Sequence, residues 1–286
     1  MAASVVGATT APPLQCGVFW FLHISKTGGT SVQEFLRGVA HQQRKWKFVN
    51  LEHQPCDKRL TSQNIMDWDH SPTWKAAQHE LNRTTPYLLV HQHHCSPGFG
   101  AHLLPQLLQL KRSLRVRGCS LALGTVLREP TSWARSAIYF TRLRYEYMRN
   151  FVSSLSDYQV KFIMFGYSKN WPAPLSGSMA TTDLAKRAAQ TLAAFDLVGR
   201  TDNLSLFTSS VAKVIGVDPP ELPHIFDSGA LPAAAHPFEL TESDMAFIQQ
   251  HSVADAWLWE HTFHSSQSLA KAIVAFAPTY LGWKPS

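Results

Sequence analysis

The sequence predicts an α/β fold with three layers, in which helices cover both faces of a central parallel β-sheet. Two segments, residues 17–23 and 120–127, are apolar on both faces, as expected of strands covered by helices on each side. Segments with helical spacing follow these strands, and such alternation is typical of a parallel sheet. We therefore expect one α/β domain.

The N-terminal half of the chain supplies three of the expected strands. After the strand at 17–23, apolar residues recur at helical spacing over 31–40. The polar, tryptophan-containing segment 46–86 lacks clear periodicity and is interpreted as an insertion with some short helices. The other elements expected here are a strand at 87–91, a helix at 103–114 interrupted at its start by Pro105, a strand at 120–127 and a helix from Pro130 to about Asn150.

The C-terminal half is expected to be mainly helical. Its predicted elements are helices at 157–165 and 182–194, a short strand at 195–199, a helix at 201–215 that ends at Gly216, and a helix that starts at Thr241 and Asp244 and continues, with a break, through 255–268. Loops rich in proline or glycine are expected at 171–178 and 219–237. No repeat or composition shift marks a second domain. We expect a flexible segment at 1–16 and a single domain at 17–286.

Composition indicates a globular protein with a mild preference for anionic partners. The 286 residues carry a formal net charge of +6, and the pI is about 9.2. Much of the charge lies at 111–117 and at Arg135, Arg142, Arg144 and Arg149, where a solvated helix face is an equally good interpretation. The four cysteines (Cys16, Cys56, Cys95 and Cys119) have no CxxC spacing and do not settle the redox compartment.

Neither a membrane span nor a signal peptide is predicted. The longest apolar runs, such as 18–22, are far shorter than the roughly 20 residues that a transmembrane helix needs. Residues 1–16 lack the basic start and the apolar stretch of a signal peptide. They are interpreted as a loose terminus, with the remnant of a targeting segment as the alternative.

The stretch FWFLHISKTGGTSVQEFL, residues 19–36, predicts an anion-binding loop. A buried strand, a tight glycine turn and a helix start bring free backbone N–H groups together at the positive end of a helix dipole. The residues expected to bind the anion are Lys26, Thr27, Gly28, Gly29, Thr30 and Ser31. A nucleotide triphosphate P-loop would need GxxxxGK[ST], with the lysine after the glycines. A capped helix beside an incidental lysine is the alternative.

A second stretch, LALGTVLREPTSWARSAIY, predicts another phosphate site. Arg128 stands at the end of a buried strand, and Ser136 lies eight residues further, in the first turns of the next helix. An arginine fork and a hydroxyl can hold a phosphate. Taken alone, a strand-end arginine often forms only an ion pair. Beside the first site, it indicates a ligand with two separated phosphates.

Histidines cluster in a third stretch, LLVHQHHCSPG. His91 and His93 are two residues apart, so both reach one cleft only if the strand has already ended. A metal site with His94 and Cys95 is conceivable, but no partner cluster has ligand spacing, and we expect no metal. A buried structural histidine is a second alternative. The favoured role is a general base, because the ordinary pKa of histidine is near neutral.

Together the three stretches resemble the sulfotransferases that use 3′-phosphoadenosine 5′-phosphosulfate (PAPS), especially the Golgi carbohydrate enzymes of the heparan sulfate 6-O- and 2-O-types. HISKTGGTS is similar to their 5′-phosphosulfate loop, H-I-x-K-T-G-G-T-[ST], and LREPTSWARS to their 3′-phosphate site. VHQHH lies where the family keeps its histidine base. Weaker similarity in YQVKFIMFG, FDLVGRTDNLSLF and ADAWLWEHTF extends the resemblance from residue 17 to about 265.

The resemblance implies a P-loop-like fold and a PAPS-dependent transfer of a sulfuryl group to a hydroxyl of a carbohydrate, best an anionic polysaccharide. Lys26 and the amides of 27–31 would neutralise the charge on the leaving phosphate, and His93, or else His91, would take the acceptor proton. No metal and no nucleic acid are implied. A Golgi membrane enzyme is implied, although no anchor is visible, so a cytoplasmic protein stays possible. A small-molecule sulfotransferase of the same fold and a non-catalytic nucleotide-binding protein stay open as alternatives.

Overall fold

A computed structural model describes residues 16–51, 87–93, 99–166, 181–218 and 238–264. Five strands in these ranges form one sheet in the order β2-β3-β1-β4-β5, with every pair parallel. The strands are β1 (Gly17–Leu22), β2 (Trp46–Asn50), β3 (Tyr87–Gln92), β4 (Ser120–Leu127) and β5 (Leu197–Arg200). The central strand, β1, is buried along its whole length.

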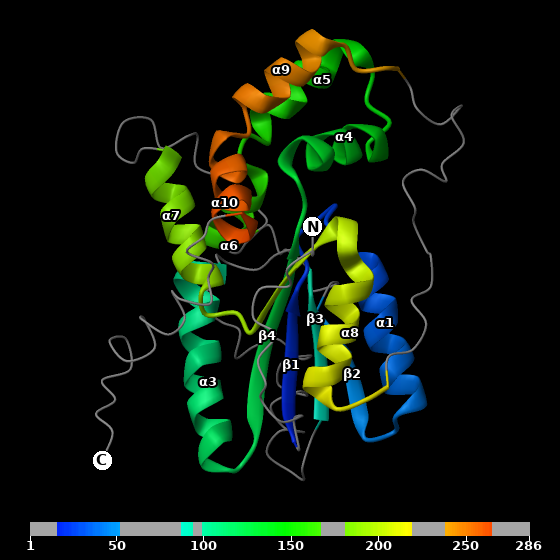
Figure 1. Ribbon diagram of the computed structural model, residues 1–286, viewed down its shortest axis with the longest axis vertical. Helices are drawn as coiled ribbons and strands as arrows, with labels where there is room; N and C mark the ends of the chain where they lie inside the picture. The colour runs from blue at the N-terminus through cyan, green and yellow to red at the C-terminus, as the bar shows by residue number, and fades with distance from the viewer. Residues whose placement is uncertain (1–15, 52–86, 94–98, 167–180, 219–237, 265–286) are drawn as a thin grey trace, which may run out of the picture.

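Helices cover both faces of this sheet (Figure 1). Phe19 and Phe21 of β1 pack with α1 (Gly29–Gln42) and α8 (Leu204–Ile215). The alternate residues Val18, Trp20 and Leu22 pack with the opposite layer. That layer includes α3 (Leu104–Val116), which follows the short π-helix η2 (Phe99–Leu103), together with α6 (Tyr158–Phe165), α7 (Thr181–Leu192) and α10 (Val253–Phe263).

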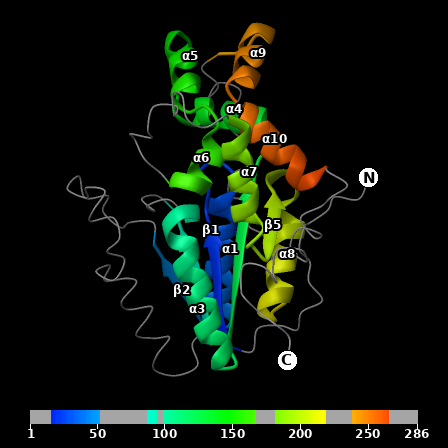
Figure 2. The same ribbon diagram turned by 90° about the vertical axis from the view of Figure 1, so that its left-hand side faces the viewer.

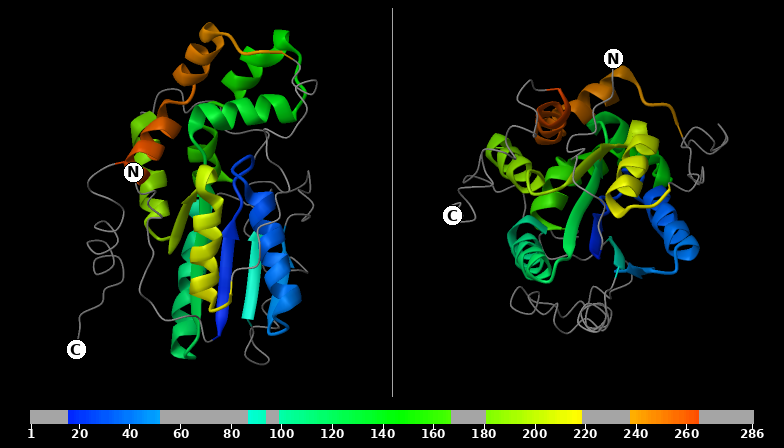
Figure 3. Two further views of the ribbon diagram at one scale, coloured as in Figure 1. Left: turned by 45° about the vertical axis from the view of Figure 1, so that its right-hand side comes forward. Right: turned by 60° about the horizontal axis from the view of Figure 1, so that its bottom comes forward.

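The two helix layers lie on either side of the sheet in the right-hand view of Figure 3, and α3 and α7 lie in front of it in Figure 2. The predicted fold class, a P-loop-like three-layer α/β/α domain with a central parallel sheet, is confirmed. No helix in the described ranges has both the length and the apolar character needed to cross a membrane.

Three helices lie beyond the carboxyl ends of the strands: α4 (Pro130–Phe140), α5 (Tyr145–Ser154) and α9 (Glu242–Gln250) (Figures 1 and 3). The loop after β1 leads to α1 on one face of the sheet, and the loop after β4 leads to α4 above its edge. In open α/β sheets, ligands bind outside the carboxyl ends of the strands, where neighbouring connections diverge in this way. The carboxyl ends of β1 and β4 are therefore the expected place for a ligand-binding site.

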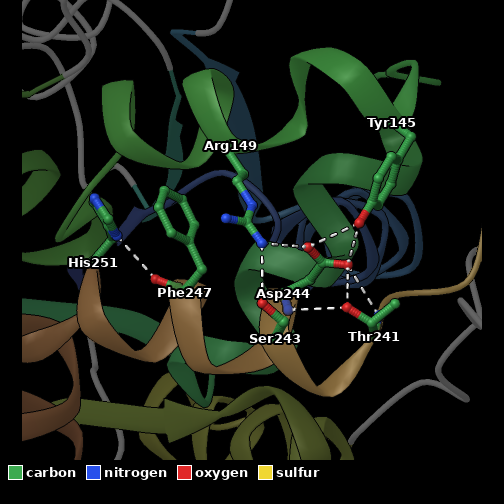
Figure 4. A network of polar contacts seen from close by, with 7 residues as sticks. All are labelled: Tyr145, Arg149, Thr241, Ser243, Asp244, Phe247 and His251. Atoms are coloured by element: carbon green, nitrogen blue, oxygen red, sulfur yellow. Dashed lines mark hydrogen bonds and ion pairs between the residues drawn. The ribbon is translucent and has the colours of Figure 1, made fainter.

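A buried carboxylate joins α5 to α9 above this edge (Figure 4). Asp244 of α9 is fully buried and accepts hydrogen bonds from the hydroxyl of Tyr145 at 3.1 Å and from the backbone N–H and hydroxyl of Thr241. The guanidinium of Arg149 lies 3.5 Å from the same carboxylate. Since an unpaired buried charge is strongly destabilising, these contacts hold α5 against α9.

Two sequence predictions are wrong in the described ranges. Residues 46–50, predicted to belong to an insertion with short helices, form the edge strand β2, paired with β3. The helix predicted from Pro130 to Asn150 is two helices, because the chain turns between Phe140 and Tyr145, where Arg142 has a φ of 49°. Residues 1–15, the rest of the predicted insertion from 52 to 86, the loops predicted at 171–178 and 219–237, and the end of the last predicted helix lie outside the described residues.

A disulfide joins Cys16, just before β1, to Cys119, just before β4, with the Cα atoms 4.8 Å apart. The other two cysteines lie outside the described residues. Since 103 positions separate Cys16 from Cys119, the bond closes a long loop and restricts the unfolded chain.

We expect reduction of this bond to lower the free energy of unfolding by about 2–5 kcal/mol. Urea denaturation with and without a reductant measures the difference. A Cys16→Ser/Cys119→Ser variant should be less stable and insensitive to reductant, whereas a Cys56→Ser/Cys95→Ser variant should keep the wild-type sensitivity. Equal sensitivity of both double variants would contradict this prediction.

Candidate anion-binding site

The β1–α1 loop, residues 23–28, follows the carboxyl end of the central strand. Gly28 is the N-cap of α1 and has a φ of 85°, a conformation that glycine adopts without steric cost. At Gly29, a Cβ atom would lie 1.8 Å from Cδ2 of His23, so only glycine lets this histidine lie against the start of the helix. The two glycines of the motif are thus explained by backbone shape and by packing.

Five consecutive carbonyl groups, those of residues 24–28, all accept hydrogen bonds from the protein. The donors to Ile24 through Thr27 are Thr27 Oγ1 at 2.7 Å, Trp133 Nε1 at 2.8 Å, Arg128 Nη1 at 3.1 Å and Thr201 Oγ1 at 2.8 Å. The carbonyl of Gly28 accepts from the backbone of α1. The acceptor side of the loop is therefore bonded to its scaffold, and α4, the residue after β4 and the segment after β5 each contribute a donor.

The backbone N–H groups where the loop meets α1 differ from these bonded carbonyls. No hydrogen bond from the N–H groups of Gly28, Gly29 or Thr30 occurs within the described ranges. Lys26 has a φ of 66°, which is uncommon for a residue other than glycine, and such strained residues cluster at ligand-binding sites. Unpaired N–H groups at a helix N-terminus form an anion site. The geometry thus suits an anion at the place where the motif predicts one.

The hydroxyl groups of the motif differ in their surroundings. Thr27 is fully buried, and its hydroxyl donates to the carbonyl of Ile24. Thr30 is exposed and Ser31 is half-buried at the first turn of α1. Only Thr30 and Ser31 therefore present hydroxyls toward the surface, while Thr27 shapes the loop, with its backbone N–H bonded to Ile24 and its carbonyl to Thr201.

Lys26 is a half-buried cation at the rim of the loop. Its Nζ lies 3.3 Å from the centre of the Phe140 ring, at the end of α4. Burial, and secondarily the charge of Arg128, lower the pKa of the Lys26 ammonium to about 8. Both causes favour release of the proton, and an anion bound between the two cations would oppose them.

Arg128 and α4 form the second half of the site. Arg128 directly follows β4, and its guanidinium donates to the carbonyl of Lys26. Burial lowers the pKa of this guanidinium, although the neighbouring Glu129 opposes the shift. Ser136 shares one face of α4 with Trp133 and Phe140, since positions i, i+3 and i+7 align on a helix. Arg128 thus contacts the first motif directly, and Ser136 lies on the same face of α4 as Trp133 and Phe140, which also contact that motif.

The predicted histidines form a buried stack with a third one. His91 is fully buried, with Nε2 3.0 Å from Nδ1 of His23 and Nδ1 3.0 Å from Oδ1 of Asn50. His93 stacks on His23 with ring centres 3.8 Å apart, and its Nε2 lies 2.9 Å from the hydroxyl of Ser25. His93 is thus tied to the β1–α1 loop through Ser25, and His91 is tied to β2 through Asn50.

His94 and Cys95 lie outside the described residues. Within the ranges that the structure describes, no three histidine, cysteine or acidic side chains are grouped so that they could hold a metal ion.

Four residues of the site have no sequence signal that predicts their role. Trp133 and Thr201 bind the carbonyls of the loop, His23 completes the histidine stack, and Gln159 binds the backbone of Arg128. Thr201 and Gln159 fall within FDLVGRTDNLSLF and YQVKFIMFG, where the family similarity is weak. That similarity marks the segments without indicating what these side chains contact.

Comparisons with known proteins add little to this geometry. No family model matches the chain, and no curated protein matches it significantly. Among solved structures, the chain is similar to retinol dehydratase, determined in complex with androsterone and the inactive cofactor PAP. The two are 12% identical with a TM-score of 0.34, and the match covers 82% of this chain and 63% of retinol dehydratase. So remote a likeness carries no argument about activity, and the inference of function depends on the site itself.

Proposed function

We propose that this protein is a sulfotransferase that moves the sulfuryl group of PAPS to a hydroxyl of a carbohydrate acceptor. One observation carries the proposal: two candidate anion sites, each with a cationic side chain, adjoin at the ends of the neighbouring parallel strands β1 and β4. The first is the β1–α1 loop with Lys26, and the second is Arg128 with α4, linked to it through the carbonyl of Lys26. PAPS has the matching pair of groups, a 5′-phosphosulfate and a 3′-phosphate.

In the proposed reaction, the bond between sulfur and the bridging phosphate oxygen breaks while a bond to the acceptor oxygen forms. Negative charge grows on the departing phosphate oxygen. The N–H groups of 28–30 and the ammonium of Lys26 are fixed before the reaction, so they can stabilise this charge without reorganisation. Arg128 and Ser136 would hold the 3′-phosphate and thereby orient the nucleotide.

The proton of the acceptor hydroxyl needs a base, for which we propose His93. Its Nε2 already faces a hydroxyl, that of Ser25. His91 is completely buried and bonded at both ring nitrogens, which suits a positioning residue for His23 better than a group that touches the acceptor. A neutral His91 that donates to Asn50 accepts from Nδ1 of His23, which fixes the tautomers of both rings.

The surface beside Lys26 suits an anionic glycan. Phe140, Tyr145 and Tyr147 are among the large apolar side chains that stay exposed in the described ranges, at 69%, 48% and 53%. Arg142 and Arg144 are exposed between them. Aromatic faces that stack on sugar rings and arginine forks that pair with carboxylate or sulfate groups would recognise an acidic polysaccharide. The Cys16–Cys119 disulfide supports a secretory compartment such as the Golgi lumen.

Transfer of radiolabelled sulfate from PAPS to a panel of acidic glycans, neutral glycans and small hydroxyl compounds tests this function. Labelling of the acidic glycans is expected. Labelling of small compounds alone would favour a small-molecule sulfotransferase instead. Nucleotide binding without transfer to any acceptor would favour a non-catalytic nucleotide-binding protein.

Adenosine 3′,5′-bisphosphate (PAP) should stabilise the protein far more than adenosine 5′-monophosphate (AMP) does, because only PAP reaches both proposed sites. At a hundredfold excess over Kd, bound ligand adds about 2.7 kcal/mol to the free energy of unfolding. Thermal melting with each nucleotide at equal concentration measures the difference. Equal shifts would contradict the pair of phosphate sites.

A further inference from the structure

Arg128 is held in place by a buried side-chain amide. Gln159, at 2% exposure, accepts a hydrogen bond from the backbone N–H of Arg128 at 2.9 Å and donates one from Nε2 to the carbonyl of Arg128 at 2.8 Å. The side-chain amide thus bonds both the N–H and the C=O of Arg128, as the backbone of a neighbouring strand would, just after β4 has ended. They fix the backbone from which the guanidinium of Arg128 extends.

Gln159 is in turn anchored where two helices meet. Its backbone N–H and that of Val160, in the first turn of α6, donate to the carboxylate of Asp255 in α10, at 3.1 and 2.8 Å. The carboxylate of Asp157, the N-cap residue of α6, accepts instead from Ala254 and Asp255 at the start of α10. Each helix thus caps the other, and neither has a cap from its own N-cap side chain.

This exchange makes Gln159 a rigid support. Asp255 is 3% exposed, and a buried carboxylate that loses a hydrogen-bond partner is costly, so the first turn of α6 cannot shift without breaking it. Burial, followed by the charge of Asp157, raises the pKa of Asp255 to about 7.

We propose that Gln159, held by Asp255, is the positioning residue that sets the affinity and selectivity for the 3′-phosphate through Arg128. The proposal rests on the proposed function, because it takes Arg128 as the ligand of that phosphate. It assigns Gln159 no contact with the nucleotide. Its effect should therefore appear in the discrimination between PAP and AMP and should disappear when Arg128 is absent.

The test is a double-mutant cycle on the ratio of the PAP and AMP dissociation constants, measured by calorimetry on the full chain. Gln159→Leu should weaken PAP binding roughly 10- to 100-fold, the range for loss of the charge-assisted hydrogen bond between the Arg128 guanidinium and the 3′-phosphate, and leave AMP binding nearly unchanged. Arg128→Ala should do the same. In the Arg128→Ala background, Gln159→Leu should cause no further loss, as expected for residues that act as one unit.

Two further variants separate positioning from general damage. Gln159→Glu keeps the acceptor for the N–H of Arg128 but loses the donor to its carbonyl, and it serves in the same cycle if the leucine variant does not fold. Thr208→Val removes a buried hydroxyl of α8 that bonds only to its own helix and should leave the PAP to AMP ratio unchanged.

The outcomes distinguish the two proposals. Additive losses in the cycle, or equal weakening of PAP and AMP, would overturn the role of Gln159. A wild-type protein that binds PAP no better than AMP would instead overturn the two-phosphate function itself.

Discussion

Replacing Lys26 by alanine is expected to lower kcat by about 10²–10³-fold, the range found when one donor to a developing oxyanion is removed. The KM for PAPS should also rise, because the ammonium lies beside the phosphosulfate site before the transfer as well as during it. Steady-state kinetics with varied PAPS measure both constants. Lys213→Ala, which removes an exposed lysine of α8, is the matched control and should leave both unchanged.

The pH dependence identifies the ammonium as the source of the effect. Because the pKa of Lys26 is lowered to about 8, the free protein loses this charge as the pH rises through 8, and kcat/KM for PAPS should fall there. Lys26→Arg keeps a cation at all accessible pH values, so its lower activity should not show the decline above pH 8. A decline that persists unchanged in Lys26→Ala would assign it to another group.

Much of the fold is predictable from sequence because a buried parallel strand is a continuous run of apolar residues. The strand predicted at 120–127 is observed with the same bounds. The edge strand β2 was missed because only one of its residues, Trp46, is buried, so its pattern is not that of a covered strand. The break between α4 and α5 was missed because no glycine or proline marks it, and Arg142 takes the positive φ instead.

The candidate site likewise contains residues that a local sequence pattern predicts and residues that only the tertiary structure reveals. Residues 26–31 could be proposed from the sequence because they are contiguous in the chain, and Arg128 because it directly follows a predicted strand. The residues that shape the site come from far away: Trp133 bonds to a carbonyl 108 positions earlier and Thr201 to one 174 positions earlier. Such contacts involve one ordinary side chain each, and no local pattern distinguishes them from surface polar residues. Only tertiary structure reveals that the carbonyls of 24–28 are bonded, whereas the N–H groups of 28–30 make no hydrogen bond within the described residues.

The histidine stack bears on how a base could work at this site. His93 is tied to the β1–α1 loop through Ser25 and packs flat on His23, whose ring is fixed in turn by His91. Movement of His93 is therefore restrained from two sides. A general base gains its effect only if it is held within reach of the proton that it removes. In the proposed mechanism, His93 is therefore the base, and His91 acts on it through His23.

His93→Ala is expected to lower kcat by at least about 10²-fold while leaving PAP affinity nearly intact, because a base acts only in the transition state. His91→Ala should have an intermediate effect, since it frees His23 without removing the base, and His94→Ala a mild one. In the wild type the rate should fall at acid pH, where protonation removes the base, and His93→Ala should lose that acid limb. Rate profiles of the three variants measure this. Near-normal turnover of His93→Ala together with loss of activity in His91→Ala or His94→Ala would move the base to that neighbour, and full activity in all three would exclude a histidine base.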